Sequence, residues 1–179
     1  MDIISLSALG PSALYSLIGL LAGLLVIAVI VLRKPMPKNA KYASMGILLA
    51  VFGVFVLTLY QSYNSELKWD DTGVSLNLPL YSQDFTASDI DWQASYIADL
   101  AIKTQLQPKW RINGLGLPGY ALGWFKLQNG NKALLSVVAA ENGTQKVVIV
   151  PIIDKDYVIM ISVEQPDTAL ALLHTQLTH

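Results

Sequence analysis

Residues Arg111–Phe125 read RINGLGLPGYALGWF, and the glycines in this stretch raise the first question about the chain. Gly114, Gly116 and Gly119 have the G-x-G-x-x-G spacing of a dinucleotide-binding loop. Such a loop needs a helix after it and an acidic residue about 20 positions on, at the end of the next parallel strand. Here a predicted β-hairpin follows instead, and Glu141 falls beside a predicted turn. The stretch therefore predicts a Pro-Gly turn between two bent strands, and no cofactor.

The chain after this stretch alternates between apolar segments and turn signals. Asn129-Gly130 separates two apolar runs and predicts a β-hairpin, because both central positions of a tight hairpin turn need positive φ. Asn142-Gly143 predicts the next turn, followed by the β-branched strand KVVIV, which stops at Pro151. Asp154-Lys155-Asp156 predicts one more turn, before the strand YVIMISV. These segments together predict three or four strands in antiparallel order.

The chain before the glycine stretch contains one further clear strand. Apolar residues at alternate positions from Val74 to Leu80 predict a strand that is buried on one face, and Pro79 predicts an edge or a strand end. The stretch from Asp84 to Lys103 fits a short helix around 88–96 or two strands, the second near 96–103. We favour the strands.

The chain ends in a predicted amphipathic helix. Pro166 suits the first helical position, and Asp167 lies near the positive end of the helix dipole. Leu170, Leu173 and Leu177 then lie on one face.

Two long uncharged segments come before this β-rich part. Ala13–Leu32 and Tyr42–Tyr60 contain 20 and 19 residues without a charged side chain, enough to cross a hydrocarbon core of about 30 Å as helices. The loop 33–41 between them contains Arg33, Lys34, Lys38 and Lys41. Short basic loops stay in the cytoplasm, so we expect a two-pass protein of the cytoplasmic membrane with both termini outside.

The organisation predicted from these segments has three parts. They are a transmembrane hairpin over 1–63, a linker over 64–72 and a β-rich domain over 73–179. We expect four aromatic residues at the outer interface: Tyr15, Tyr60, Tyr63 and Trp69. Small residues predict close packing of the helices, and we favour packing inside the hairpin over assembly with another membrane protein: Gly19, Gly23, Gly46 and Ala50. No ionisable residue lies in either segment, which disfavours a transporter or channel.

A family resemblance rests on the motifs of the β-rich part. They are Arg111-x-x-Gly114, Pro118-Gly119, Gly123-Trp124-Phe125, Asn129-Gly130, Lys132-Ala133-Leu134-Leu135, the strand that closes at Pro151, Ile161-Ser162 and the helix from Pro166. This pattern resembles bacterial PH-domain (pleckstrin-homology-like) proteins that carry the module beside transmembrane helices. The resemblance implies an α+β, mainly-β sandwich of about seven antiparallel strands plus a C-terminal helix. It also implies a membrane-tethered binding or scaffolding module without catalysis, and it specifies no ligand.

The sequence contains few residues that could form a catalytic or metal-binding site. The chain has no cysteine, and its two histidines are His174 and His179, so neither a histidine-based catalytic group nor a metal-ligand cluster can be proposed. Paired aspartates, such as Asp89 and Asp91, fall in or beside predicted turns, where aspartate is favoured for local hydrogen bonds. We therefore expect no enzyme, no cofactor and no metal.

Binding remains as the predicted function. Residues 64–179 carry a net charge of −4, which disfavours nucleic acid. We expect a scaffold or accessory subunit of a bacterial envelope complex that binds a membrane or envelope protein, with Lys109, Arg111 and Lys126 as the candidate surface. The alternative is a domain that senses a lipid headgroup or a small ligand, and assembly of several copies also stays open. For the aromatic residues we favour core positions over an exposed recognition patch: Trp92, Trp110, Tyr120 and Trp124.

Overall fold

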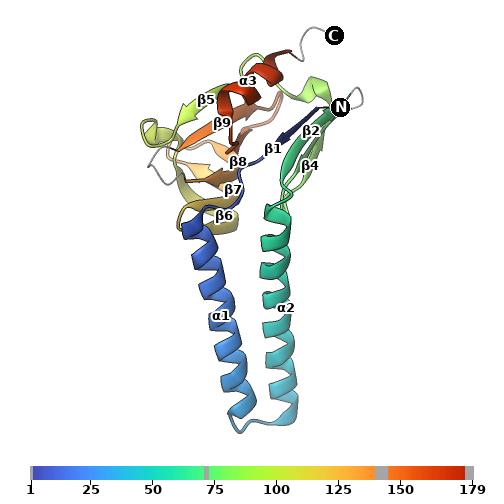
Figure 1. The fold of residues 1–179 in the computed structure, drawn as a ribbon, viewed down its shortest axis with the longest axis vertical. Coiled ribbons are helices and arrows are strands. Elements are labelled where there is room, and N and C mark those ends of the chain that lie inside the picture. Colours follow the sequence, from blue (N-terminus) through green and yellow to red (C-terminus); the bar gives the residue numbers. More distant parts are fainter. Residues whose placement is uncertain (1, 71–72, 140–144, 176–179) are drawn as a thin grey trace.

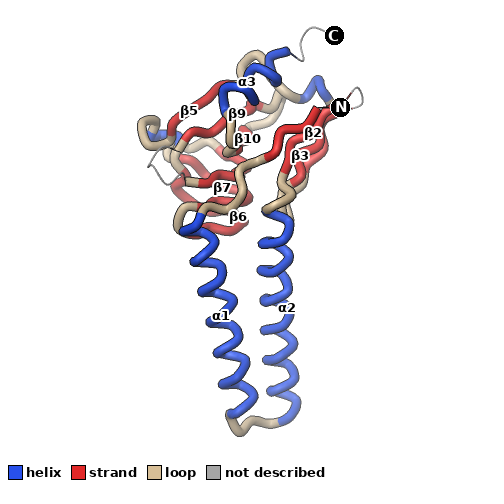
Figure 2. Tube along the Cα trace, viewed as in Figure 1, coloured by secondary structure: helices blue, strands red, loops and turns tan. Residues whose placement is uncertain are grey.

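Two long helices project side by side from one end of a β-domain (Figures 1 and 2). The computed structural model describes residues 2–70, 73–139 and 145–175. The helices are α1 (Pro11–Arg33) and α2 (Lys38–Ser62), so each predicted apolar segment is helical and extends slightly beyond its expected ends. Both helices are long and apolar enough to cross a membrane, and only 6% of the most apolar stretch of each is buried.

The two helices contact each other through large apolar side chains. The less exposed positions of α1 recur every three or four residues: Leu14, Leu17, Leu21, Leu24, Ala28 and Val31. Leu17 of this row belongs to a core cluster against which Phe55 and Leu59 of α2 pack. This spacing is that of a helix face that meets a neighbouring helix.

The small residues do not lie in this contact, which differs from our prediction of glycine packing inside the hairpin. Gly19, Gly23, Gly46 and Ala50 are exposed. A Cβ atom at any of the three glycines would meet no atom within 4 Å. Gly19 and Gly23 each follow a contact leucine by two residues, which turns them by about 200° to the other side of the helix. The leucines and phenylalanines therefore set the spacing of the helices.

The β-domain contains two sheets and a C-terminal helix (Figure 1). The first sheet has the order β1-β2-β3-β4: β1 (Asp2–Ser5), β2 (Glu66–Asp70), β3 (Gly73–Asn77) and β4 (Gln83–Phe85). The second has the order β5-β9-β10-β8-β7-β6: β5 (Tyr96–Asp99), β6 (Pro108–Leu117), β7 (Tyr120–Leu127), β8 (Lys132–Val138), β9 (Lys146–Pro151) and β10 (Tyr157–Ile161). Helix α3 (Pro166–Thr175) contacts β5 and β9.

This architecture confirms the predicted fold class, with two differences in the strands. We expected about seven strands, and the described residues form ten. We expected antiparallel order throughout, but β10 lies between β9 and β8 and pairs parallel with β8. The central residues of β8, β9 and β10 are buried, so these strands lack an alternation of polar and apolar residues. Their sequences therefore do not indicate which strands are neighbours in the sheet.

The first sheet joins the two sides of the helical hairpin. β1, which comes before α1, pairs antiparallel with β2, which comes after α2. The range 64–72, which we expected to be a linker, thus contains a strand. Trp69 of β2 is buried in the core, so our prediction that it lies at the membrane interface is wrong for this residue.

The core lies on both faces of the second sheet. Between the two sheets and α3, the buried cluster includes Leu76, Leu122 and Leu173. On the other face, a second cluster includes Phe125 and Met160. Leu100 and Leu106 on the connection from β5 to β6 belong to that second cluster, so β5–β6 helps to close the face.

The glycine stretch forms the hairpin β6–β7. Gly119 has a φ of +75° directly after Pro118, which is the pattern of a type II turn. Gly114 and Gly123 face each other across the two strands, and a Cβ atom on Gly123 would lie 2.6 Å from the Asn113 carbonyl oxygen. The register shifts twice in β6, between Pro108 and Trp110 and between Arg111 and Asn113. These shifts are β-bulges at positions 109 and 112, before the glycines, whereas Gly114 and Gly123 allow the two strands to approach closely.

The other predicted turns are mostly present. Asn129-Gly130 connects β7 to β8, but only Gly130 has positive φ, and its N–H donates to the Leu127 carbonyl at 3.0 Å. The connection is therefore longer than the two-residue turn we expected. Asp154 has a φ of +57° in the turn before β10. The predicted Asn142-Gly143 turn lies outside the described residues.

Two ambiguous regions now have defined elements. Between Asp84 and Lys103 the structure has β4, the short 3₁₀ helix η1 (Ala87–Asp89) and β5, so the strand alternative is confirmed with shorter strands. A second 3₁₀ helix, η2 (Thr104–Leu106), precedes β6. Helix α3 begins at Pro166, as predicted.

Candidate binding surface on strand β6

Strand β6 is the outermost strand of the second sheet and exposes five consecutive side chains. Its only neighbour among the described strands is β7, and residues 109–113 are all exposed. The two bulges add to the exposed residues, because each places an extra residue on β6, at positions 109 and 112, that has no partner on β7. Trp110 is 71% exposed and Ile112 is 53% exposed.

An open pocket of about 400 Å³ lies along this strand. Its lining residues are Pro108, Lys109, Trp110, Arg111, Gly116 and Phe125. Gly116 leaves room beside the Arg111 guanidinium, since a Cβ atom at position 116 would be 3.9 Å from Nη1. The pocket thus combines an aromatic ring, two cationic groups and apolar walls, which is the mixture found at many binding sites.

The charge around this pocket differs from that of the rest of the domain. Residues 100–140 contain five of the eight bases of residues 64–179 and no acidic residue, although residues 64–179 have a net charge of −4. Among the described residues the only ion pair joins Lys68 and Glu66, so Lys109 and Arg111 have no acidic partner there. The surface is therefore locally cationic on an acidic domain.

Two of the three remaining bases of this region, Lys103 and Lys132, contact aromatic rings. Lys132 Nζ lies 4.3 Å from the centroid of the Trp124 ring, which packs edge-on against Tyr157 at 4.9 Å. Lys103 Nζ lies 5.1 Å from the Tyr96 ring centroid. Cation–π contacts of this kind hold both lysines against the domain.

The structure brings together two of the three predicted site residues. Lys109 and Arg111 line the pocket, whereas Lys126 does not. Lys126 is paired with Trp110 on one side and with Lys132 on the other, while Arg111 is paired with Phe125. Residues that pair across strands share a face, so Lys126 lies on the same face as Trp110, and Arg111 lies on the same face as Phe125.

The aromatic residues separate into core and surface positions. Trp92 and Tyr120 are buried, and Trp124 packs partly buried against the core, in agreement with the favoured prediction. Trp110 is exposed, so the core prediction is wrong for this residue. The sequence contains one indication of this exposure, because Trp110 lies between the bases Lys109 and Arg111. Pro108 precedes these three residues.

The acidic residues in turns make local hydrogen bonds. Asp89 accepts a hydrogen bond from the Thr86 N–H at 2.8 Å, and hydrogen bonds from the side chain and backbone of Thr86 hold the pKa of Asp89 below its ordinary value. Asp91 accepts one from the Ala94 N–H at 3.0 Å. In the part of the chain that the structure describes, no three His, Asp or Glu residues gather to hold a metal ion. His174 lies on α3, 3.1 Å from the Ser95 carbonyl oxygen.

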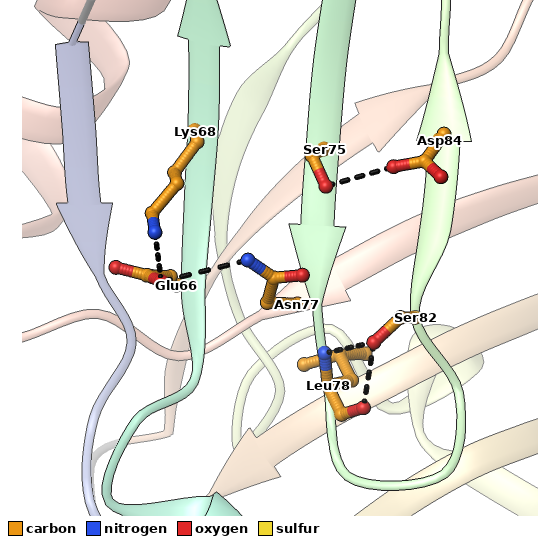
Figure 3. Close-up of polar contacts among 7 residues, drawn as sticks. All are labelled: Glu66, Lys68, Ser75, Asn77, Leu78, Ser82 and Asp84. Carbon is orange, nitrogen blue, oxygen red and sulfur yellow. Dashed lines mark hydrogen bonds and ion pairs between the residues drawn. The ribbon is translucent and has the colours of Figure 1, made fainter.

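The outer face of the first sheet is polar, but its groups bind one another (Figure 3). Lys68 Nζ lies 2.5 Å from Glu66 Oε1, and Ser75 Oγ donates to Asp84 Oδ1 at 2.8 Å. Asn77 Nδ2 donates a longer hydrogen bond to Glu66 Oε1 at 3.5 Å. This face thus contrasts with β6, where the cations have no acidic partner in the part of the chain that the structure describes.

Comparison with known protein families identifies the family of this domain. The family model described as "Bacterial PH domain" matches residues 68–174, which extend from β2 into α3. No curated protein and no solved structure matches the chain.

Proposed function

The chain belongs to the bacterial PH domain family, and from this premise we propose that it anchors a PH-like binding module in the cytoplasmic membrane, as a non-catalytic scaffold or accessory subunit of an envelope complex. The hairpin α1–α2 spans the bilayer, and the basic segment 33–41, which includes the connection between the two helices, lies in the cytoplasm. The domain and both termini lie on the periplasmic side. The β6 surface binds a protein partner.

The exposure of the two helices supports the membrane anchor. Large apolar side chains are exposed along both helices, for example Leu25 at 56% and Leu49 at 65%. Two such helices in water would expose more apolar surface than the few hundred Å² that a soluble monomer usually tolerates. A bilayer covers this surface and leaves no backbone group unpaired, because the helices satisfy their own hydrogen bonds.

The ends of the helices support their position in the bilayer. Three tyrosines near the ends that join the domain are strongly exposed: Tyr15, Tyr60 and Tyr63. Tyrosine is favoured at the boundary between membrane and water. The four bases at the other end favour a cytoplasmic loop.

The observation that carries the partner-binding role is Trp110, exposed between two cations on an acid-free region. Tryptophan and arginine dominate the binding energy of many protein interfaces, and here both line one pocket. Lys109 and Arg111 complement an acidic segment of a partner. The rest of the domain is acidic, so this charge selects the β6 surface over the other faces.

The orientation is tested by a reporter fused after residue 179. Alkaline phosphatase folds to its active form only in the periplasm, so we expect an active fusion. The same reporter inserted in the loop 33–41 is expected to be inactive. The reversed pattern would refute the proposed orientation.

The partner is tested by a photo-cross-linking amino acid at position 110 in living cells, with position 96 as the control because Tyr96 is a less exposed aromatic on β5. We expect a protein adduct at position 110 and none at position 96. Arg111→Glu is expected to remove the adduct, while Lys155→Glu, a charge reversal in an exposed turn, leaves it. An adduct with lipid alone, or one that survives Arg111→Glu, would refute the proposed surface.

A further inference from the structure

The loop between β3 and β4 lies at the end of the β-domain where the helices join it (Figure 1). Gln61 in the last turn of α2 and Asn64 just after the helix enclose a small pocket of about 180 Å³ together with Asn77, Leu78 and Ser82. The loop Leu78–Ser82 therefore lies beside the last turn of α2. In the proposed orientation this level is the outer boundary of the membrane.

Leu80 at the tip of this loop is both exposed and conformationally unusual. Its side chain is 55% exposed, and its φ of +63° lies in the left-handed region that leucine rarely adopts. Strain of this kind persists only where the surroundings enforce it, and it is often linked to function. The protein therefore leaves more than half of this large apolar side chain uncovered.

The loop is fixed in place by hydrogen bonds (Figure 3). The Leu78 N–H donates to Ser82 Oγ at 3.2 Å, and Ser82 Oγ donates to the Leu78 carbonyl at 3.0 Å. Tyr81 Oη donates to Asn113 Oδ1 on β6 at 3.1 Å, which ties the loop to the second sheet. The loop thus presents Leu80 on a rigid support.

The surroundings of the loop match the boundary between lipid and water. The sequence LPLYS of residues 78–82 contains no charge. Tyr60 and Tyr63 at the end of α2 are 69% and 57% exposed. Apolar side chains next to such tyrosines are typical of segments that contact the headgroup region of a bilayer.

We propose that the loop Leu78–Ser82 is a membrane-contact loop, in which Leu80 inserts into the headgroup–acyl boundary of the bilayer that the hairpin spans. The inference rests on the proposed transmembrane position of α1 and α2. The bilayer then provides apolar surroundings for Leu80. The hydrogen bond from Tyr81 to Asn113 connects the membrane-contact loop to β6. The bilayer then sets the height and tilt of the domain and of the β6 surface.

The chain has no cysteine, so single-cysteine variants of the full chain can carry a spin label in nanodiscs of phosphatidylethanolamine and phosphatidylglycerol. Leu80→Cys tests the loop. Ile153→Cys is the matched control, because Ile153 is 44% exposed and precedes Asp154, another residue with positive φ. The Ile153 N–H donates a hydrogen bond to the Asp89 carbonyl oxygen in η1. Because η1 follows the end of β4 that is opposite to the loop Leu78–Ser82, Ile153 lies away from this loop. Val26→Cys, exposed in the middle of α1, reports on the hairpin.

We expect labels at positions 80 and 26 to collide mainly with oxygen, which concentrates in lipid, and the label at position 153 to collide mainly with a water-soluble nickel complex. A label at position 80 that resembles the one at 153, while position 26 is lipid-exposed, would overturn the membrane-contact loop alone. A label at position 26 that is exposed to water would overturn the membrane anchor itself.

A second measurement uses the unmodified chain and so does not depend on how a variant folds. Hydroxyl-radical labelling followed by mass spectrometry reports the solvent exposure of Leu80 and Ile153 in the same nanodiscs. We expect Leu80 to be oxidised several-fold less than Ile153, although it is the more exposed of the two in the protein alone. Equal or greater oxidation of Leu80 would overturn the proposal.

Discussion

Replacing Gly123 by alanine is expected to destabilise the β-domain by roughly 2–5 kcal/mol. Gly123 has a φ of +105°, and a left-handed conformation costs an alanine about 1–2 kcal/mol. The added Cβ would also lie 2.6 Å from the Asn113 carbonyl oxygen and 2.8 Å from the Gly114 Cα, and forced overpacking adds about 1–3 kcal/mol. Both neighbours are backbone atoms of β6, so the strand itself would have to move.

Two other glycines separate the backbone cost from the steric cost. Gly130 has a φ of +89°, but a Cβ there meets nothing within 4 Å, so Gly130→Ala is expected to cost only about 1–2 kcal/mol. Gly116 does not have a positive φ, and a Cβ atom at this position would meet only the Arg111 Nη1, at 3.9 Å. Gly116→Ala is therefore expected to change stability by less than about 0.5 kcal/mol.

The assay is guanidinium unfolding of the full chain in detergent, followed by tryptophan fluorescence. All four tryptophans lie outside α1 and α2, so the signal reports on the β-domain. The midpoint should fall in the order Gly116→Ala, Gly130→Ala, Gly123→Ala, with an unchanged slope. If Gly123→Ala loses no more stability than Gly130→Ala, the close approach of β6 and β7 does not explain why position 123 requires a glycine.

Three further variants test other parts of the domain by the same unfolding assay. Ile4→Ala should cost about 2–5 kcal/mol because Ile4 of β1 is 7% exposed, whereas its neighbour Ile3, at 50%, should cost far less; equal losses would argue against a core role for β1. Ser162→Ala should cost about 1–3 kcal/mol, because the Val138 N–H donates to Ser162 Oγ at 3.0 Å and would lose its partner; a neutral result would show that water replaces the hydroxyl. Burial raises the pKa of Tyr120 above its ordinary value of 10.0, so the stability that this group contributes is present below pH 10 and is lost as the pH rises further. Tyr120→Phe should weaken this alkaline loss, and an unchanged pH profile would assign it to other groups.

The elements that the sequence predicts well are those that depend on neighbouring residues. The two apolar helices, the β7–β8 connection and the start of α3 at Pro166 follow from run length, turn residues and helix period. The insertion of β10 beside β8 depends on distant pairing, and the uniformly apolar centres of these strands give it no local signal. β1 is only four residues long and finds its partner beyond both helices, so it has no local signal either.

The same distinction applies to the candidate surface. Lys109 and Arg111 could be named from the sequence as cations near a bent strand, and the structure places both at one pocket. Which face each base occupies depends on the two bulges, because a shift of one residue moves a side chain to the other face of the sheet. The sequence does not mark these bulges, so it could not show that Lys126 lies outside the pocket. The exposure of Trp110 follows from the edge position of β6, which is a property of the whole sheet.

If the two helices span the membrane as proposed, the pairing of β1 with β2 imposes an order of events during synthesis. Asp2 is paired with Trp69, so the first strand leaves the ribosome long before its partner and must wait while both helices are made and inserted. Ile4 and Leu6 can enter the core only when the two ends of the hairpin emerge on the same side of the bilayer. A chain in which one helix failed to insert would leave β1 and β2 on opposite sides, with an unpaired sheet edge open to proteases. In the proposed arrangement, the first sheet can therefore form only after both helices have been inserted.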